Sequence, residues 1–180
     1  MSNYGTLIDK NTVHFERLLT GPIERVWQYL TEPELRGKWF AAGEMEPRVG
    51  GALDLTFNQS RLVGNDGPPP ERFKKYTGIH KSQHIVTRFD PPHLLAFTWS
   101  NGIDGEPSEV EITLTQRGDK VLLELTHRRL GNREAAVNVS GGWHVHLGLL
   151  AELLADQKPT PFWQAFDGLE EHYEKQIPKA

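Results

Sequence analysis

The chain has 180 residues, a formal net charge of −4 and no cysteine. This length suits a single domain over 1–180, with a core at about 12–157 and a C-terminal extension at 158–180. Without cysteine the chain can form no disulfide, no thiolate nucleophile and no cysteine-ligated metal site. The slightly acidic balance gives no general attraction to phosphate backbones, so we expect no nucleic-acid partner.

The sequence also predicts a cytoplasmic protein. The opening segment lacks the charged-then-apolar layout of a secretory signal. No stretch approaches the roughly 20 apolar residues that a membrane-spanning helix needs. We therefore expect no membrane span.

The first elements in chain order are a strand and a helix. Residues 12–19 alternate between apolar and polar, which is typical of a half-buried strand. Gly21 then suits the N-cap of a helix, and Pro22 suits its first position, where the missing N–H costs nothing. Apolar residues recur behind them at helical spacing, namely Ile23, Val26, Trp27 and Leu30.

A second short helix is predicted directly afterwards. Thr31 and Glu34 have the spacing of a capping box, in which each side chain accepts from a main-chain N–H of the first turn. This helix should carry Leu35 and Trp39. Two short helices therefore separate the first strand from the rest of the sheet.

The middle of the chain predicts a series of antiparallel strands. Strand-like runs occupy 53–57, 77–89, 94–100, 110–114 and 121–125, with turn sequences such as Pro91-Pro92 and Arg117-Gly118-Asp119 between them. The stretch 59–72 contains Asn65-Asp66-Gly67 followed by three prolines. Such a composition cannot hold a ladder of hydrogen bonds, so we expect an exposed loop there.

The clearest helical pattern comes after the strands. One apolar stripe at helical spacing contains Trp143, His146, Leu147, Leu150, Leu153 and Leu154. Ser140 is predicted as its N-cap, and the helix should run to about Gln157. A last helix is expected from Phe162 to Lys175. The long helix must bury its stripe, and the inner face of a curved sheet is the large apolar surface that the strands can offer.

Several short motifs in this order resemble those of one superfamily. They are Pro22-Ile23-Glu24-Arg25-Val26-Trp27 with Leu30-Thr31, Lys38-Trp39-Phe40, Gly50-Gly51, the run from Pro91 to Trp99, and Gly141-Gly142-Trp143 with His146-Leu147. On these motifs the chain resembles the START-like, or SRPBCC, superfamily. It is most similar there to the branch named after the activator of the heat-shock-protein-90 ATPase, in which many bacterial members have no assigned activity.

The resemblance implies an α+β helix-grip fold like that of the birch pollen allergen. In this fold a curved antiparallel sheet surrounds a long C-terminal helix. The order is one strand, two helices, five or six strands and the long helix, here with an extra C-terminal helix. Relatives hold lipids, polyketides, plant hormones or other apolar molecules between sheet and helix. No catalytic residue is shared across the superfamily, so the resemblance assigns none here.

Nine residues are predicted to line such a cavity: Trp39, Phe57, Phe97, Trp99, His127, Trp143, His146, Leu147 and Leu150. Large aromatic rings serve equally to fill cores and to wall apolar pockets. His127 and His146 point inward in the predicted register, so each is either a hydrogen-bonded core histidine or a polar anchor for a ligand. No histidine pair has the spacing of a metal site, and we expect neither metal nor cofactor.

Three functions remain open at this level. The first is binding of a lipid-like or polyketide-like apolar or aromatic molecule, which calls for a closed cavity above about 300 Å³. The second is a protein-interaction role, including the co-chaperone role that the branch name implies. The third is a cyclase or dehydratase that uses an inward histidine, and the lack of an inward carboxylate pair argues against an enzyme. The extension could close the cavity, dock outside the sheet or pair two chains as a homodimer.

Overall fold

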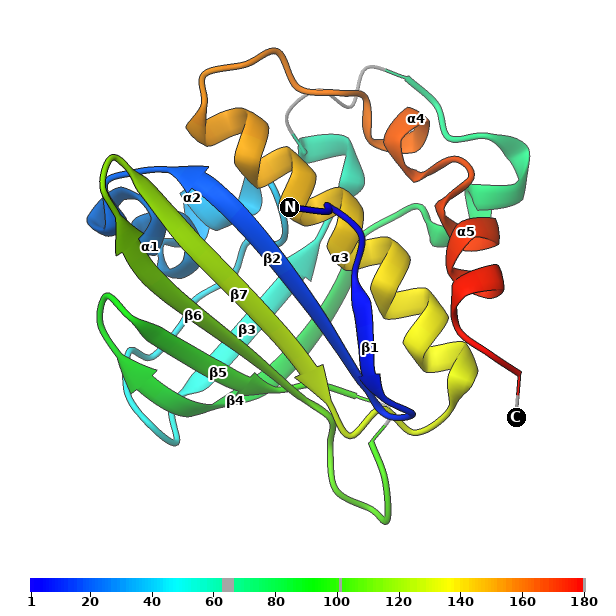
Figure 1. Cartoon of the computed structure of the whole chain (residues 1–180), viewed down its shortest axis with the longest axis horizontal. Helices are drawn as coiled ribbons and strands as arrows, with labels where there is room; N and C mark the ends of the chain where they lie inside the picture. Colours follow the sequence, from blue (N-terminus) through cyan, green and yellow to red (C-terminus); the bar gives the residue numbers. More distant parts are fainter. Residues whose placement is uncertain (63–66, 101, 180) are drawn as a thin grey trace.

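Seven strands form one antiparallel sheet in the computed structural model, which describes residues 1–62, 67–100 and 102–179 (Figure 1). Their order across the sheet is β1-β2-β7-β6-β5-β4-β3. The strands are β1 (Thr6–Asp9), β2 (Thr12–Thr20), β3 (Ala52–Phe57), β4 (His80–Asp90), β5 (Leu94–Thr98), β6 (Glu109–Arg117) and β7 (Lys120–Arg128). The five strands predicted after the first one are all present, and β1 is an edge strand that the sequence pattern did not reveal.

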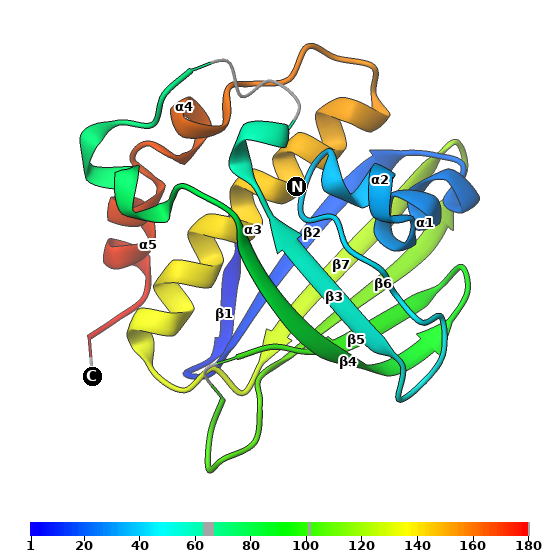
Figure 2. The same cartoon turned by 180° about the vertical axis from the view of Figure 1, so that it is seen from behind.

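The long helix lies across one face of this sheet (Figures 1 and 2). The helices are α1 (Ile23–Thr31), α2 (Pro33–Gly37), α3 (Arg133–Leu154), α4 (Phe162–Phe166) and α5 (Leu169–Gln176). In both views α1 and α2 lie at one end of the molecule, and α5 lies at the opposite end beside α3. This arrangement confirms the predicted α+β helix-grip fold. Among the described residues, no helix is both long and apolar enough to cross a membrane.

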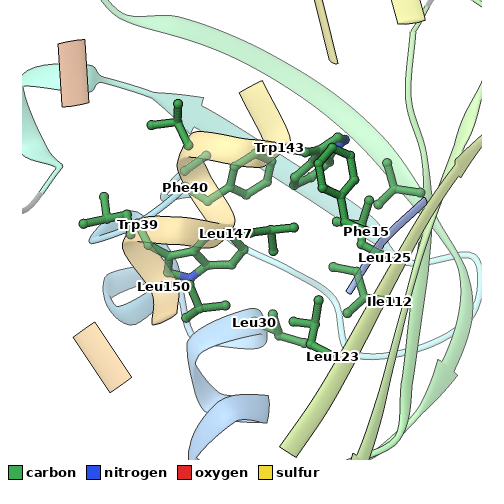
Figure 3. Close-up of a cluster of buried hydrophobic side chains, with 14 of the residues drawn as sticks. Phe15, Leu30, Trp39, Phe40, Ile112, Leu123, Leu125, Trp143, Leu147 and Leu150 are labelled. Atoms are coloured by element: carbon green, nitrogen blue, oxygen red, sulfur yellow. The ribbon is translucent and has the colours of Figure 1, made fainter. Parts of the chain in front are cut away.

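Alternation along the strands directs one set of side chains toward α3. In β7, Val121, Leu123, Leu125 and His127 are all buried, whereas the residues between them are partly exposed. Figure 3 shows Leu147 and Leu150 of α3 facing the apolar side chains of the strands. Burying one such leucine contributes about 1.5–3 kcal/mol, so this interface is the main source of apolar stabilisation for the helix.

Two predicted helix starts are wrong in detail. Pro22 itself is the N-cap of α1, so Gly21 lies outside the helix. The capping box does not form, because Thr31 Oγ1 donates to the main-chain oxygen of Trp27 at 2.9 Å and Glu32 becomes the N-cap of α2. The second helix is accordingly short, and Trp39 follows it.

The start of the long helix also differs from the prediction. The helix begins seven residues before Ser140, and Asn132 is the N-cap, whose side chain accepts from Ala135 N at 2.9 Å. Ser140 is buried within the helix, and α3 ends at Leu154 rather than at about Gln157. The first two turns of the helix form because Ala135 and Ala136 are buried. The sequence Ser140-Gly141-Gly142 resembles a helix start, so the prediction placed the start there and left these turns out.

The remaining differences concern the loop at 59–72 and the tail. Short 3-10 helices occupy Gln59–Arg61 and Glu71–Tyr76, and Asn65 and Asp66 of the predicted turn lie outside the described residues. The single helix predicted from Phe162 to Lys175 is divided into α4 and α5. Gly168 adopts a left-handed conformation with φ of 81° and separates the two helices.

A buried arginine holds the segment between α2 and β3. The Arg36 guanidinium is 3% exposed and donates to the main-chain oxygens of Ala41, at 3.0 Å, and of Gly43. It also donates to the oxygen of Thr31 at 3.2 Å, near the C-terminus of α1. A guanidinium can satisfy several carbonyls at once because it carries five N–H donors in a fixed plane. Arg36 therefore fixes the chain on both sides of Phe40.

Candidate functional site

Two small pockets flank α3 near its N-terminal half. The sheet-side pocket, of about 270 Å³, is lined by Phe40, Phe57, Trp99, Asn138, Val139, Gly142, Trp143 and His146. The tail-side pocket, of about 250 Å³, is lined by Gln59, Val137, Asn138, Gly141, Gly142, His146, Phe162, Trp163, Phe166 and Glu170. Both have largely aromatic walls and are partly open at the surface. We treat this pair as the candidate binding site.

The two pockets share one row of residues on α3. Asn138, Gly142 and His146 line both of them, and their spacing of four places them on one face of the helix. Gly142 stands in the middle of the row. A Cβ added at Gly142 would have no neighbour within 4 Å, so packing does not require a glycine there. The missing side chain instead leaves space between the two pockets.

Aromatic rings hold the walls of the sheet-side pocket in place. The Phe40 ring packs on Trp143 with centroids 5.0 Å apart and meets the Phe57 ring edge-on at 5.1 Å. The Phe57 ring in turn meets Trp99 edge-on at 6.1 Å. Edge-on and tilted pairs are the favoured arrangements of aromatic rings, which makes these walls rigid.

The tail-side pocket takes three of its aromatic residues from α4. The rings of Phe162 and Phe166 stack with centroids 6.0 Å apart, and Trp163 meets Phe162 edge-on at 5.0 Å. The Phe162 ring also contacts His146, with centroids 5.4 Å apart. The C-terminal extension thus packs beside α3 and forms a wall of the candidate site.

His146 links the two pockets and has one free ring nitrogen. Its Nδ1 lies 2.7 Å from the main-chain oxygen of Trp39, and a carbonyl can only accept, so Nδ1 carries the hydrogen. Burial lowers the pKa of His146 to about 4, so the ring is neutral at pH 7. The Nε2 lone pair makes no hydrogen bond within the described part of the chain.

His127 has a different environment, with partners on both ring nitrogens. Trp143 Nε1 donates to His127 Nδ1 at 3.1 Å, which leaves the hydrogen on Nε2, 3.0 Å from Ser108 Oγ. Ser108 Oγ donates in turn to the main-chain oxygen of Ser100 at 2.5 Å. Desolvation lowers the pKa of His127 to about 3. This side chain is a fully hydrogen-bonded core histidine with no free nitrogen for a ligand or for proton transfer.

The nine predicted site residues fall into two groups. Phe57, Trp99, Trp143 and His146 come together around the sheet-side pocket. The other five line neither pocket and pack in the core, namely Trp39, Phe97, His127, Leu147 and Leu150. Figure 3 shows Trp39 close to Leu147 and Leu150, on the helix side of the core. The middle of the helix–sheet interface is thus filled, and each pocket is smaller than the closed cavity that the sequence led us to expect.

The lining residues that sequence reasoning missed include Phe40, Gly142 and Asn138, as well as the three aromatic residues of α4. Phe40 follows Trp39, which was the predicted lining residue. The motif Lys38-Trp39-Phe40 does not indicate which of the two rings faces the pocket. Gly142 was read as part of a helix start, although a glycine pair inside an apolar helical pattern can signal a close approach or a gap. Asn138 precedes the predicted helix start, so no helical face could be assigned to it.

A separate polar cluster lies on the outer face of the sheet. His14 and Glu16 of β2 and Glu124 of β7 bring ligand-type atoms within 4.8 Å of one another. His14 Nδ1 is also 3.0 Å from Thr126 Oγ1. Exposed carboxylates often gather beside histidines without an ion, so this cluster alone assigns no metal site.

Comparison with known proteins places this architecture in a family. The protein encoded by the gene BPP1335 of Bordetella parapertussis is 40% identical, with a TM-score of 0.83 over 99% of this chain and 92% of that one. CalU16 from Micromonospora echinospora is 23% identical, with a TM-score of 0.67 over 93% and 89%. DynU16, from the dynemicin biosynthetic locus, is 21% identical, with a TM-score of 0.58 over 86% and 51%.

No curated protein sequence matches the chain. The family model described as "Activator of Hsp90 ATPase homolog 1-like protein" matches residues 20–155, which include α1, α2, the sheet from β3 to β7 and all of α3. The match ends before α4, so the wall that α4 adds to the tail-side pocket is outside the shared part. The chain belongs to the Activator of Hsp90 ATPase homolog 1-like family.

Proposed function

We propose that this protein binds an apolar or aromatic small molecule, lipid-like or polyketide-like, in the two pockets beside α3. The observation that carries the proposal is the shared row on α3, in which Gly142 stands between two aromatic-walled pockets. Ligand pockets in proteins are typically concave and apolar with a few placed polar groups. Here the polar groups are Asn138 and His146 on the row itself, together with Gln59 and Glu170 in the tail-side pocket.

The choice of residue at Gly142 supports this proposal. A glycine inside a helix costs roughly 0.5–1 kcal/mol relative to alanine. A methyl group would fit at this position without contact, so the cost is not imposed by a neighbouring side chain. A ligand that passes over the helix at Gly142 would account for the gap.

The ligand's shape follows from the arrangement of the pockets. Each holds about 250–270 Å³, which is at the lower limit for a ligand pocket. A single elongated, flat molecule could occupy both by crossing Gly142. The fold of DynU16, which comes from a biosynthetic locus, is in keeping with a small-molecule role.

Fluorescence titration with N-phenyl-1-naphthylamine, a neutral apolar dye, tests the proposal. The wild-type protein should bind the dye saturably, and Gly142→Leu should weaken binding at least tenfold because the new side chain occupies the space between the pockets. Gly148→Leu is the matched control, since it makes the same change in the same helix outside both pockets. Equal dye binding by the wild type and Gly142→Leu would contradict the proposal.

A second candidate is binding to a chaperone, which the family description favours. This role predicts that the protein raises the ATPase rate of the Hsp90-type chaperone from the same organism. An unchanged ATPase rate with a molar excess of the protein would exclude it. Because Gly142→Leu alters only the pockets, it should leave such an effect intact.

A further inference from the structure

Building on the proposed function, we infer that the ligand is a neutral hydroxylated aromatic compound whose hydroxyl donates a hydrogen bond to His146 Nε2. The inference concerns the polar recognition of the ligand rather than its apolar binding. It depends on three features of the site: the fixed tautomer of His146, the position of its ring, and the charges around the pockets.

The tautomer makes His146 an acceptor toward the pockets. Its Nδ1–H is committed to the main-chain oxygen of Trp39 at 2.7 Å, so the lone pair is on Nε2. Trp39 is itself fixed, because its Nε1 donates to the main-chain oxygen of Tyr29 at 2.8 Å. A neutral imidazole held in this way can accept from an O–H or N–H group and cannot donate to a carboxylate or a ketone.

The position of the ring places this acceptor among aromatic surfaces. His146 is 8% exposed and lines both pockets. Its ring meets Phe40 edge-on at 5.3 Å on one side and packs on Phe162 at 5.4 Å on the other. A flat aromatic ligand that stacks in either pocket can therefore bring a hydroxyl on its edge to the same nitrogen.

The charges around the pockets favour a neutral ligand. Of the described residues that line them, Glu170 alone carries a charge at pH 7. It is negative, so it repels carboxylate and phosphate groups. No lining side chain in this set offers a cation to an acidic ligand. His146 Nε2 is not among the buried polar atoms that lack a partner in the described part of the chain, so it is open to the pockets, where a ligand hydroxyl can reach it.

Binding of 2-naphthol and of 2-methoxynaphthalene tests the inference, because the two probes share a ring system and only the first has a hydroxyl donor. Isothermal titration calorimetry on the wild type should give a dissociation constant about tenfold lower for 2-naphthol. In His146→Asn the side-chain amide can still donate to Trp39 from the place of Nδ1, and its oxygen then stands at the place of ring Cδ2, one bond short of the acceptor position of Nε2. The ratio of the two constants should then fall close to one. His93→Phe, which removes an exposed histidine in the β4–β5 turn, should keep the wild-type ratio.

The possible results separate the inference from the proposed function. Equal affinity of the wild type for both probes would overturn the inference and leave apolar binding intact. A tenfold preference that persists in His146→Asn would also overturn it, because the donor would then be recognised elsewhere. Failure of both probes to bind would reject the proposed function together with the inference.

A second measurement covers the case in which His146→Asn does not fold. In the wild-type protein, the ¹⁵N resonance of His146 Nε2 should shift when 2-naphthol is added and stay in place with 2-methoxynaphthalene. An Nε2 resonance that responds equally to both probes would overturn the inference.

Discussion

Two buried histidines in this protein differ in function because they differ in the number of their partners. His127 has a donor on one ring nitrogen and an acceptor on the other, so it serves the core. His146 uses one nitrogen for the main chain and leaves the second for the pockets. The sequence predicts for both positions a histidine that points inward. The difference comes from Ser108, Trp143 and the Trp39 carbonyl, which the fold brings together from distant segments.

Replacing Ser108 by alanine should destabilise the protein by about 1–3 kcal/mol. The substitution leaves the His127 Nε2–H without its acceptor and the main-chain oxygen of Ser100 without the donor it now has. Both Ser108 and His127 are 0% exposed, so water cannot easily replace the lost bonds. Urea unfolding followed by tryptophan fluorescence would measure the change.

Ser100→Ala is the matched control for this prediction. Ser100 is exposed, and it takes part in the hydrogen bonds around His127 only through its main-chain oxygen, which alanine also has. The control should change the free energy of unfolding by less than about 0.5 kcal/mol. A similar loss in both variants would mean that the buried hydrogen-bonded chain is not the cause.

At the scale of elements, periodicity located the sheet and the long helix but misplaced several ends. The strands and the apolar stripe of α3 could be predicted because both face one shared core. That core requires apolar residues at the regular spacing of a strand or of a helix. The start of α3 was missed because Ser140-Gly141-Gly142 resembles a break, whereas burial of Ala135 and Ala136 extends the helix to the Asn132 cap. Local sequence alone does not report that burial.

The glycines of α3 allow a prediction at this scale. Gly148→Ala should stabilise the protein by roughly 0.5–1 kcal/mol, because alanine restricts the unfolded chain and suits a helix. A Cβ at Gly148 would meet nothing within 4 Å, so no clash offsets the gain. Thermal unfolding by circular dichroism would show a higher Tm than that of the wild type.

Gly43→Ala provides the opposing control. Gly43 has a φ of +110°, and its added Cβ would lie 2.2 Å from the main-chain oxygen of Asp54. The variant should therefore lose stability, in contrast to Gly148→Ala. If Gly148→Ala lowered the Tm as Gly43→Ala does, the helix at Gly148 would be more tightly packed than the structure indicates.

At the scale of the whole molecule, the site lies where the family fold and the C-terminal extension meet. The sheet-side pocket is built entirely from residues within the range matched by the family model, whereas α4 lies beyond that range. The sequence predicted an extra helix in the tail and left its place open, since an amphipathic segment does not specify which surface it covers. Packing of α4 beside α3 gives this protein a second pocket.

The whole molecule should also lose stability in mild acid. The pKa of His127 falls to about 3 and that of His146 to about 4 in the folded protein, from an ordinary value of 6.5. The unfolded chain therefore binds protons that the folded chain does not, so stability is lost as pH falls below 6.5. Between pH 7 and pH 5 His127 and His146 should each cost about 2 kcal/mol. Half-buried His144, whose pKa burial lowers to about 4, adds a smaller loss.

Urea unfolding at pH 7, 6 and 5 would measure this loss in a range where most carboxylates stay ionised. His146→Asn should reduce the loss between pH 7 and pH 5 by about 2 kcal/mol, because the imidazole that resists protonation is gone. His93→Gln should leave it unchanged, since His93 is exposed in the β4–β5 turn. A free energy of unfolding that stays constant from pH 7 to pH 5 would show that the two rings take up protons in the folded protein. The neutral state of His146, on which acceptance of a ligand hydroxyl depends, would then not hold.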